Sequence, residues 1–148
     1  MRKNRLFILA GGTLGALSRF SIRNSNDWNS YGQIPFDTLF INITGSFMIG
    51  LILTLAVKLA IFDDKLRLGI TVGFLSAFTT FSTFCKETVL LIEAGKVQAA
   101  LFYITASLVL GLTAVYFGYL FALFLSGKLK RLNGGEIIAE NNKEGDAA

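Results

Sequence analysis

The sequence predicts an all-α integral membrane protein with four transmembrane helices. Of its 148 residues, 53% are hydrophobic and only 16% are charged, whereas a soluble domain carries about 25% charged residues. A transmembrane helix needs about 20 predominantly apolar residues. The stretches that meet this need are residues 5–24, 36–60, 66–92 and 97–126. None shows the roughly ten-residue alternation of an outer-membrane β-barrel, so strands are not expected.

The first stretch follows a basic N-terminal segment, residues 1–5, and ends near Arg23. A basic start and an apolar run resemble a signal peptide. However, the run continues through Arg19 without a clear small-residue cleavage site. We therefore interpret it as a permanent first helix. A polar loop over residues 24–35 leads to the second stretch, and a charged turn over residues 58–67 leads to the third.

Glycine pairs with four-residue spacing occur at Gly11/Gly15 and Gly69/Gly73. This spacing lets helix backbones approach closely, so we expect tight packing of the first and third helices against neighbours. The fourth helix completes a transmembrane domain over residues 1–132. The polar, acidic tail over residues 133–148 is expected to be disordered or a frayed helix.

The clearest functional signal is the string GFLSAFTTFSTF at residues 73–84. Polar groups at bilayer depth normally face a bundle interior or a water-filled path. Packing alone explains the phenylalanines but not the hydroxyls between them. Hydroxyl side chains can bend or break a membrane helix, and a broken helix exposes carbonyls that can hold a cation. The side chains concerned are Thr79, Thr80, Ser82 and Thr83, with Phe78, Phe81 and Phe84.

A second polar face lies on the second helix, where Thr38, Asn42 and Ser46 recur every four residues. Two interpretations remain open: these groups join helices, or the Asn42 amide donates to an anion. The positive ring edges of Phe81 and Phe84 favour an anion. A cation site would require carboxylates, which we expect to be almost absent from the membrane interior.

Other functions are disfavoured by what the sequence lacks. It has no histidine, one cysteine and no Walker-type phosphate loop, so we expect neither an enzyme nor an ATP-driven transporter. A proton-coupled exporter needs a membrane-embedded carboxylate, usually in its first helix, and this first helix has none. A non-conducting partner subunit of a paired channel is a further alternative. Arg19 either snorkels to the interface or makes a vestibule positive.

Three blocks of the sequence resemble the small bacterial fluoride channels called Fluc or CrcB. The blocks are GGTLGALSRF at 11–20, TLFINITGSFMIGL at 38–51 and GFLSAFTTFSTF at 73–84. The resemblance implies a passive, fluoride-selective channel in the bacterial plasma membrane, which exports fluoride and protects against its toxicity. It also implies an antiparallel dimer with two pores and a broken third helix. The family often has glycine where this chain has Asp37 and Ser76.

The resemblance also implies roles for particular residues. The pore residues would be Thr38, Asn42, Phe81, Ser82, Thr83 and Phe84. A structural sodium ion at the dimer centre would be held by the carbonyls of Ser76 and Thr79, and Arg19 would line the vestibule.

The distribution of charge predicts an orientation in the membrane. With four helices, and counting up to Arg131, nine Lys/Arg residues lie on the side of the termini and four on the other. The richer side is normally cytoplasmic. A homodimer or a heterodimer with an inverted homologous subunit remains open, and this imbalance favours the heterodimer.

Overall fold

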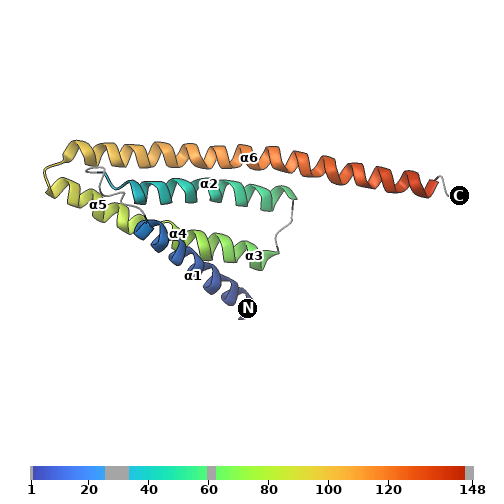
Figure 1. Ribbon diagram of the computed structural model, residues 1–148, viewed down its shortest axis with the longest axis horizontal. Coiled ribbons are helices and arrows are strands. Elements are labelled where there is room, and N and C mark those ends of the chain that lie inside the picture. The colour runs from blue at the N-terminus through green and yellow to red at the C-terminus, as the bar shows by residue number, and fades with distance from the viewer. Residues whose placement is uncertain (1, 26–33, 60–62, 146–148) are drawn as a thin grey trace.

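The computed structural model describes residues 2–25, 34–59 and 63–145, which are helical over nearly their whole length (Figure 1). No strand occurs in this part of the chain, as the sequence predicts. The elements are α1 (Arg2–Ser25), α2 (Phe36–Leu59), α3 (Asp64–Leu68), the π-helical segment η2 (Gly69–Leu75), α4 (Ser76–Phe78), α5 (Phe81–Glu93) and α6 (Val97–Gly145). Most of the predicted loop at 24–35 lies outside the described residues.

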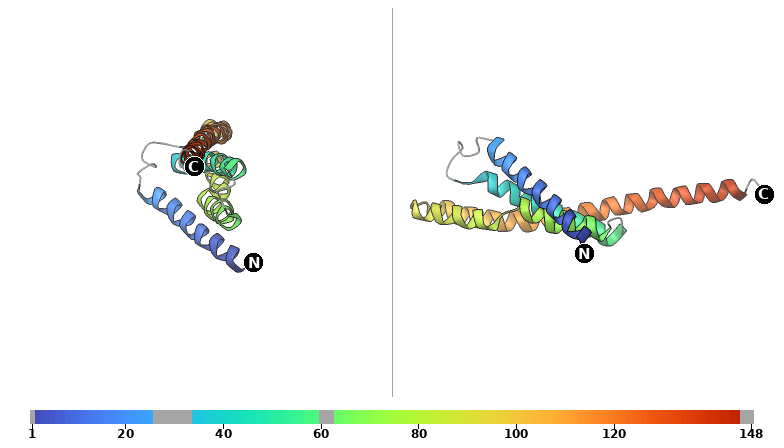
Figure 2. Two further views of the ribbon diagram at one scale, coloured as in Figure 1. Left: turned by 90° about the vertical axis from the view of Figure 1, so that its right-hand side faces the viewer. Right: turned by 90° about the horizontal axis from the view of Figure 1, so that it is seen from below.

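Within the described ranges, three segments are long and apolar enough to cross a membrane: Phe36–Leu59, Lys65–Glu93 and Val97–Leu129. Their mean hydropathies are 2.0, 1.5 and 2.2. α1 does not reach the same combination of length and apolarity. It nevertheless runs obliquely beside the third segment (Figure 2) and exposes large apolar side chains, which include Leu6, Leu9, Leu14, Leu17 and Phe20.

Glycines hold α1 against η2, as the four-residue spacing predicts. A Cβ atom added at Gly11 would collide with the carbonyl of Gly69, and one at Gly15 would collide with the backbone of Phe74. A Cβ added at Gly73 would lie 2.6 Å from a carbonyl oxygen of α1. Side chains at these positions would therefore push the two helices apart.

Glycines also allow close backbone contact between α2 and α6. A Cβ atom at Gly50 would meet the carbonyl of Val115, and one at Gly118 would meet the carbonyl of Phe47. Close backbone contact on this side holds α2 between α6 and the third segment (Figure 1). The polar residues of α2 therefore have fixed neighbours.

The third segment changes conformation between α4 and α5. Thr79 has φ −75° and ψ 159°, and Thr80 has φ −147° and ψ 120°. Both residues are extended, so the ladder of helical hydrogen bonds stops there. We call this pair, Thr79 and Thr80, the interruption. Thr80 then caps α5, because its hydroxyl oxygen accepts a hydrogen bond from the backbone N–H of Thr83 at 3.2 Å.

The last helix is longer than the predicted stretch 97–126. α6 continues to Gly145, so helical backbone extends into the tail that we expected to be disordered or frayed. The N-terminal end of α1 and the C-terminal ends of α2 and α6 point to the same end of the molecule (Figure 1).

Candidate functional site

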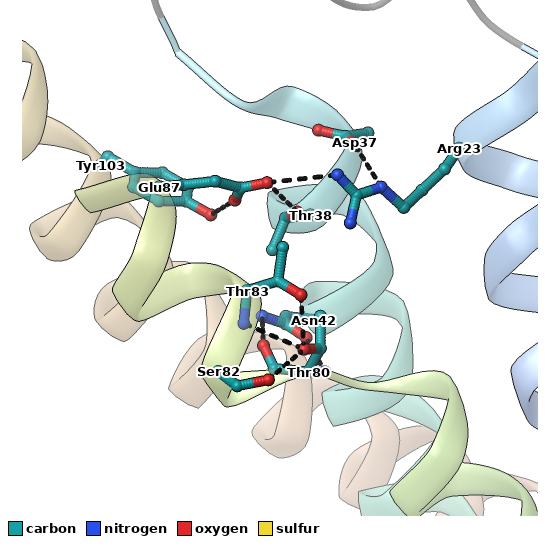
Figure 3. Close-up of polar contacts among 9 residues, drawn as sticks. All are labelled: Arg23, Asp37, Thr38, Asn42, Thr80, Ser82, Thr83, Glu87 and Tyr103. Atoms are coloured by element: carbon teal, nitrogen blue, oxygen red, sulfur yellow. Dashed lines mark hydrogen bonds and ion pairs between the residues drawn. The ribbon is translucent and has the colours of Figure 1, made fainter. Parts of the chain in front are cut away.

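Asn42 binds the backbone of the extended residue Thr80 (Figure 3). Its Nδ2 donates to the Thr80 carbonyl at 3.0 Å, and its Oδ1 accepts from the Thr80 N–H at 2.9 Å. These bonds replace the helical partners that Thr80 lacks, which a buried backbone requires. Asn42 therefore joins α2 to the interruption, and one of its two N–H groups is left over.

The Thr80 hydroxyl is the centre of a small cluster. It donates to Thr83 Oγ1 at 2.9 Å and lies 3.4 Å from Ser82 Oγ. Thr80 is buried, Thr83 is half-buried and Ser82 is exposed. The hydroxyls thus form a connected series from the interior to the surface. The sequence grouped these residues, but it did not single out Thr80, whose extended backbone creates the arrangement.

Phe81 and Phe84 are neighbours, as their three-residue spacing predicts. Their ring centroids are 5.9 Å apart, and the Phe84 ring lies 5.1 Å from that of Tyr103. Phe81 is 78% exposed, whereas Phe84 packs against a buried cluster that includes Leu39 and Tyr103. One ring therefore faces outward and the other is held in place.

A carboxylate that sequence analysis missed lies one helical turn beyond this cluster. The Thr38 hydroxyl donates to Glu87 Oε1 at 3.0 Å, and the Tyr103 hydroxyl donates to Oε2 at 2.9 Å (Figure 3). Thr38 and Tyr103 are fully buried. The available signal was that Glu87 follows Thr83 by four residues on α5 and so shares its face.

A second missed carboxylate belongs to Asp37. Its Oδ2 lies 3.1 Å from Nε of Arg23, and Nη2 of the same guanidinium lies 3.5 Å from Glu87 Oε1. The Asp37 side chain is only 7% exposed, and its Oδ1 is buried without a hydrogen-bond partner. Two carboxylates are therefore largely buried in the protein at this end of α2, while their near absence from the membrane interior stays a prediction. Asp37 and Glu87 come together there because one arginine bridges them.

Most of the predicted site residues line one of two separate cavities, and Phe84 and Thr38 line neither. One, of about 310 Å³, lies between α2 and the interruption, and Asn42, Ser46, Ser76, Thr79, Thr80 and Phe81 are among its lining residues. The other, of about 600 Å³, lies between α1 and α5 and includes Arg19, Arg23, Ser82 and Thr83. The hydroxyl cluster lies between the two. Thr38 is fully buried, and its hydroxyl donates to Glu87.

The carbonyls of Ser76 and Thr79 fit a site for a hard cation. In a continuous helix, the N–H groups of Thr80 and Thr83 would bond to them. Here the Thr80 N–H donates to Asn42 and the Thr83 N–H donates to the Thr80 hydroxyl. Carbonyl oxygens without their helical donors are suitable cation ligands. Among the described residues, no group of three or more His, Cys, Asp or Glu side chains could hold a metal.

The fold and this site define a small helical membrane protein with a polar interruption in one of its apolar segments. The family described as "CrcB-like protein, Camphor Resistance (CrcB)" matches residues 6–119, and the chain belongs to this family.

Several named relatives cover most of the chain. It is 38% identical over 127 residues to "Fluoride-specific ion channel FluC 1" of Methanosarcina acetivorans, a match over 84% of this chain and 95% of that protein. It is 40% identical over 114 residues to "Fluoride-specific ion channel FluC" of a Thermus thermophilus strain, over 77% and 90% of the two chains. The protein of that name from Methylococcus capsulatus is also 40% identical, over 136 residues, which are 88% of this chain and 58% of that longer protein.

Proposed function

We propose that this protein is a passive, fluoride-selective channel that exports fluoride from the bacterial cytoplasm and protects the cell against it. The observation that carries the proposal is the donor cluster at the interruption, where amide and hydroxyl groups lie between two cavities. Family membership supports the choice of ion, since relatives of this chain are named fluoride-specific ion channels. Hydrogen fluoride is a weak acid that crosses membranes in its neutral form and dissociates inside, so the trapped anion needs a conductive exit.

The donors at the interruption would replace part of the water around a small anion. Asn42 has one N–H beyond the bond to Thr80, and Thr83 keeps its own hydroxyl proton because it accepts from Thr80. The exposed ring of Phe81 presents positive edges beside these donors. Arg19 and Arg23 line the cavity on the other side and would attract anions to it.

The channel would also hold a structural sodium ion. The carbonyls of Ser76 and Thr79 support this proposal, because the N–H groups that would occupy them in a continuous helix bind elsewhere. A bound sodium ion would supply a fixed positive charge beside the interruption. The chain's own contribution is to hold the carbonyls in place, through the bond between Asn42 and Thr80.

The assembly would be a dimer of two inverted copies or of two inverted homologous chains, with two pores. Four membrane spans are part of the proposal, and α1 would be the fourth because it exposes large apolar side chains to its surroundings. The exposed ring of Phe81 lines the cavity beside Asn42, which supports a pore completed there by a second chain.

Efflux from liposomes tests the proposal. Purified protein is reconstituted into liposomes that contain potassium fluoride or potassium chloride, and valinomycin allows potassium to follow the anion. We expect rapid loss of fluoride and little loss of chloride, without a proton gradient. Equal rates for the two anions would contradict fluoride selectivity. Efflux that requires a proton gradient would indicate an exporter, and no efflux with or without the homologous subunit would indicate a non-conducting protein.

A further inference from the structure

We propose that Arg23 and Asp37 form a charge-balancing bridge that makes Glu87 compatible with the passage of anions. In this account the Arg23 guanidinium offsets the carboxylate of Glu87 at the edge of the larger cavity. Asp37 is a positioning residue that holds Arg23 in place. The inference rests on the proposed function, because it concerns the path of an anion.

The geometry ties three helices to one guanidinium (Figure 3). Arg23 lies in the last turn of α1, and it contacts Asp37 of α2 through Nε at 3.1 Å. It contacts Glu87 of α5 through Nη2 at 3.5 Å. These contacts use two of the three guanidinium nitrogens. The side chain remains 43% exposed and lines the cavity that contains Thr83.

The charges explain why such a bridge is needed. Glu87 lies one helical turn from Thr83, on the same face of α5. An uncompensated carboxylate in this place would repel an anion that approaches the Thr83 hydroxyl, and the low dielectric of the interior would strengthen the repulsion. Hydrogen bonds from Thr38 and Tyr103 orient Glu87 but do not remove its charge. Arg23 contributes the positive charge that faces it.

Asp37 is poorly explained by stability alone. Its carboxylate is nearly buried, and one oxygen, Oδ1, has no hydrogen-bond partner. Burial of this carboxylate costs free energy because its charge loses water, and its half-exposed partner Arg23 offsets that cost only in part. The position of Asp37 does account for the direction of Arg23, since the contact with Nε turns the rest of the guanidinium toward Glu87.

A set of charge variants tests the bridge in the fluoride efflux assay. Arg23→Gln leaves two carboxylates uncompensated, so we expect efflux to fall roughly tenfold, the scale on which local fields change ion capture. Asp37→Asn removes one negative charge but loosens Arg23, so its loss should be smaller. The double variant should conduct better than Arg23→Gln alone, because one of the two uncompensated carboxylates is gone.

Lys65→Gln is the matched control, because Lys65 forms an exposed pair with Asp63 at 3.3 Å in another part of the molecule. It should leave efflux unchanged.

Chemical modification of the folded protein separates charge from folding. Arg23→Cys is prepared in a Cys85→Ser background, reconstituted, and treated with thiosulfonate reagents that attach either a positive or a negative group. We expect the positive reagent to raise fluoride efflux and the negative reagent to lower it. Equal effects of the two reagents, or full efflux from Arg23→Gln, would overturn the bridge while the wild-type protein still conducts fluoride. A wild-type protein that does not conduct fluoride would instead overturn the proposed function.

Discussion

At the scale of single residues, the Asn42 amide has groups for two different partners, the Thr80 backbone and the proposed anion. Both its oxygen and one N–H bind the Thr80 backbone. The two interpretations of this residue, a joint between helices and an anion donor, are therefore compatible. The described geometry accounts for the joint, and the remaining N–H is what the proposed channel uses.

Asn42→Asp should damage both roles. A carboxylate cannot donate to the Thr80 carbonyl, and leaving a buried polar group unpaired costs about 1–3 kcal/mol. It would also place a negative charge beside the donors. We expect a lower melting temperature in detergent and nearly complete loss of fluoride efflux. Thr54→Ala is the control on the same helix, because the Thr54 hydroxyl donates within α2, to the Gly50 carbonyl. This control should change neither the melting temperature nor the fluoride efflux greatly. Normal efflux from Asn42→Asp would remove this residue from the path.

The two phenylalanines should separate function from stability. Phe81→Ile and Phe84→Ile are tolerable changes in an apolar setting, and we expect each to reduce fluoride efflux strongly. Phe84→Ile should lower the free energy of unfolding more than Phe81→Ile, because Phe84 pairs with both Phe81 and Tyr103 and aromatic pairs contribute about 0.5–1.5 kcal/mol each. Efflux and thermal unfolding of the same preparations test this. Wild-type efflux in both variants would place the pore elsewhere.

Some of these residues could be predicted from sequence and others could not. Asn42 and the hydroxyls stand out because polar groups are rare within apolar stretches. The Glu87 site does not stand out, because its partners Thr38 and Tyr103 are 49 and 16 residues away. Contacts of this kind depend on how helices pack, and a local pattern contains no information about them.

At the scale of the elements, the interruption of the third segment depends on a glycine of a neighbouring helix. A Cβ atom added at Gly45 of α2 would collide with the methyl group of Thr79 and lie 3.6 Å from the Phe78 ring. Thr79 is one of the two extended residues. The absence of a side chain at position 45 is therefore what lets α2 lie against the interruption.

Gly45→Ala should displace the interruption and reduce fluoride efflux at least severalfold. Gly111→Ala is a matched control on α6, because its Cβ would meet Ser46 Oγ at an ordinary distance of 3.7 Å. Alanine also favours a helix over glycine by about 1 kcal/mol. We expect the control to keep its efflux and its melting temperature. Equal efflux from the two variants would show that contact with Thr79 does not set the conformation of the interruption.

The elements were largely predictable, with two instructive differences. Apolar length predicts α2, the third segment and α6, and glycine spacing predicts the close contact of α1 with η2. The π-helical turns of η2 were not predicted, since a hydrophobic pattern cannot distinguish them from α-helical turns in a wholly apolar segment. α6 is also longer than the predicted stretch 97–126, and it continues into the tail for which the sequence left either disorder or a frayed helix open.

At the scale of the whole molecule, the N-terminal end of α1 and the C-terminal end of α6 point the same way as the C-terminal end of α2 (Figure 1). The nine Lys/Arg residues assigned to this side outnumber the four on the other. Such an imbalance favours a single orientation with the richer side in the cytoplasm. An inverted dimer would then need a second, oppositely biased chain.

Reporter fusions at the C-terminus test this orientation. We expect activity from a reporter that works only in the cytoplasm and almost none from one that works only outside it. Arg67→Glu together with Lys65→Glu weakens the bias and should shift part of the signal outward. Comparable signals from both reporters on the unaltered chain would mean dual insertion, which supports a homodimer and contradicts the heterodimer.

The proposed channel conducts fluoride in preference to other anions. The most direct measurement is the zero-current voltage across a planar bilayer that contains the protein, with potassium fluoride on one side and an equal concentration of potassium chloride on the other. A fluoride-selective path predicts a large voltage, with the fluoride side positive because fluoride leaves it. A voltage near zero in the presence of a protein-dependent current would show that the protein does not select fluoride over chloride.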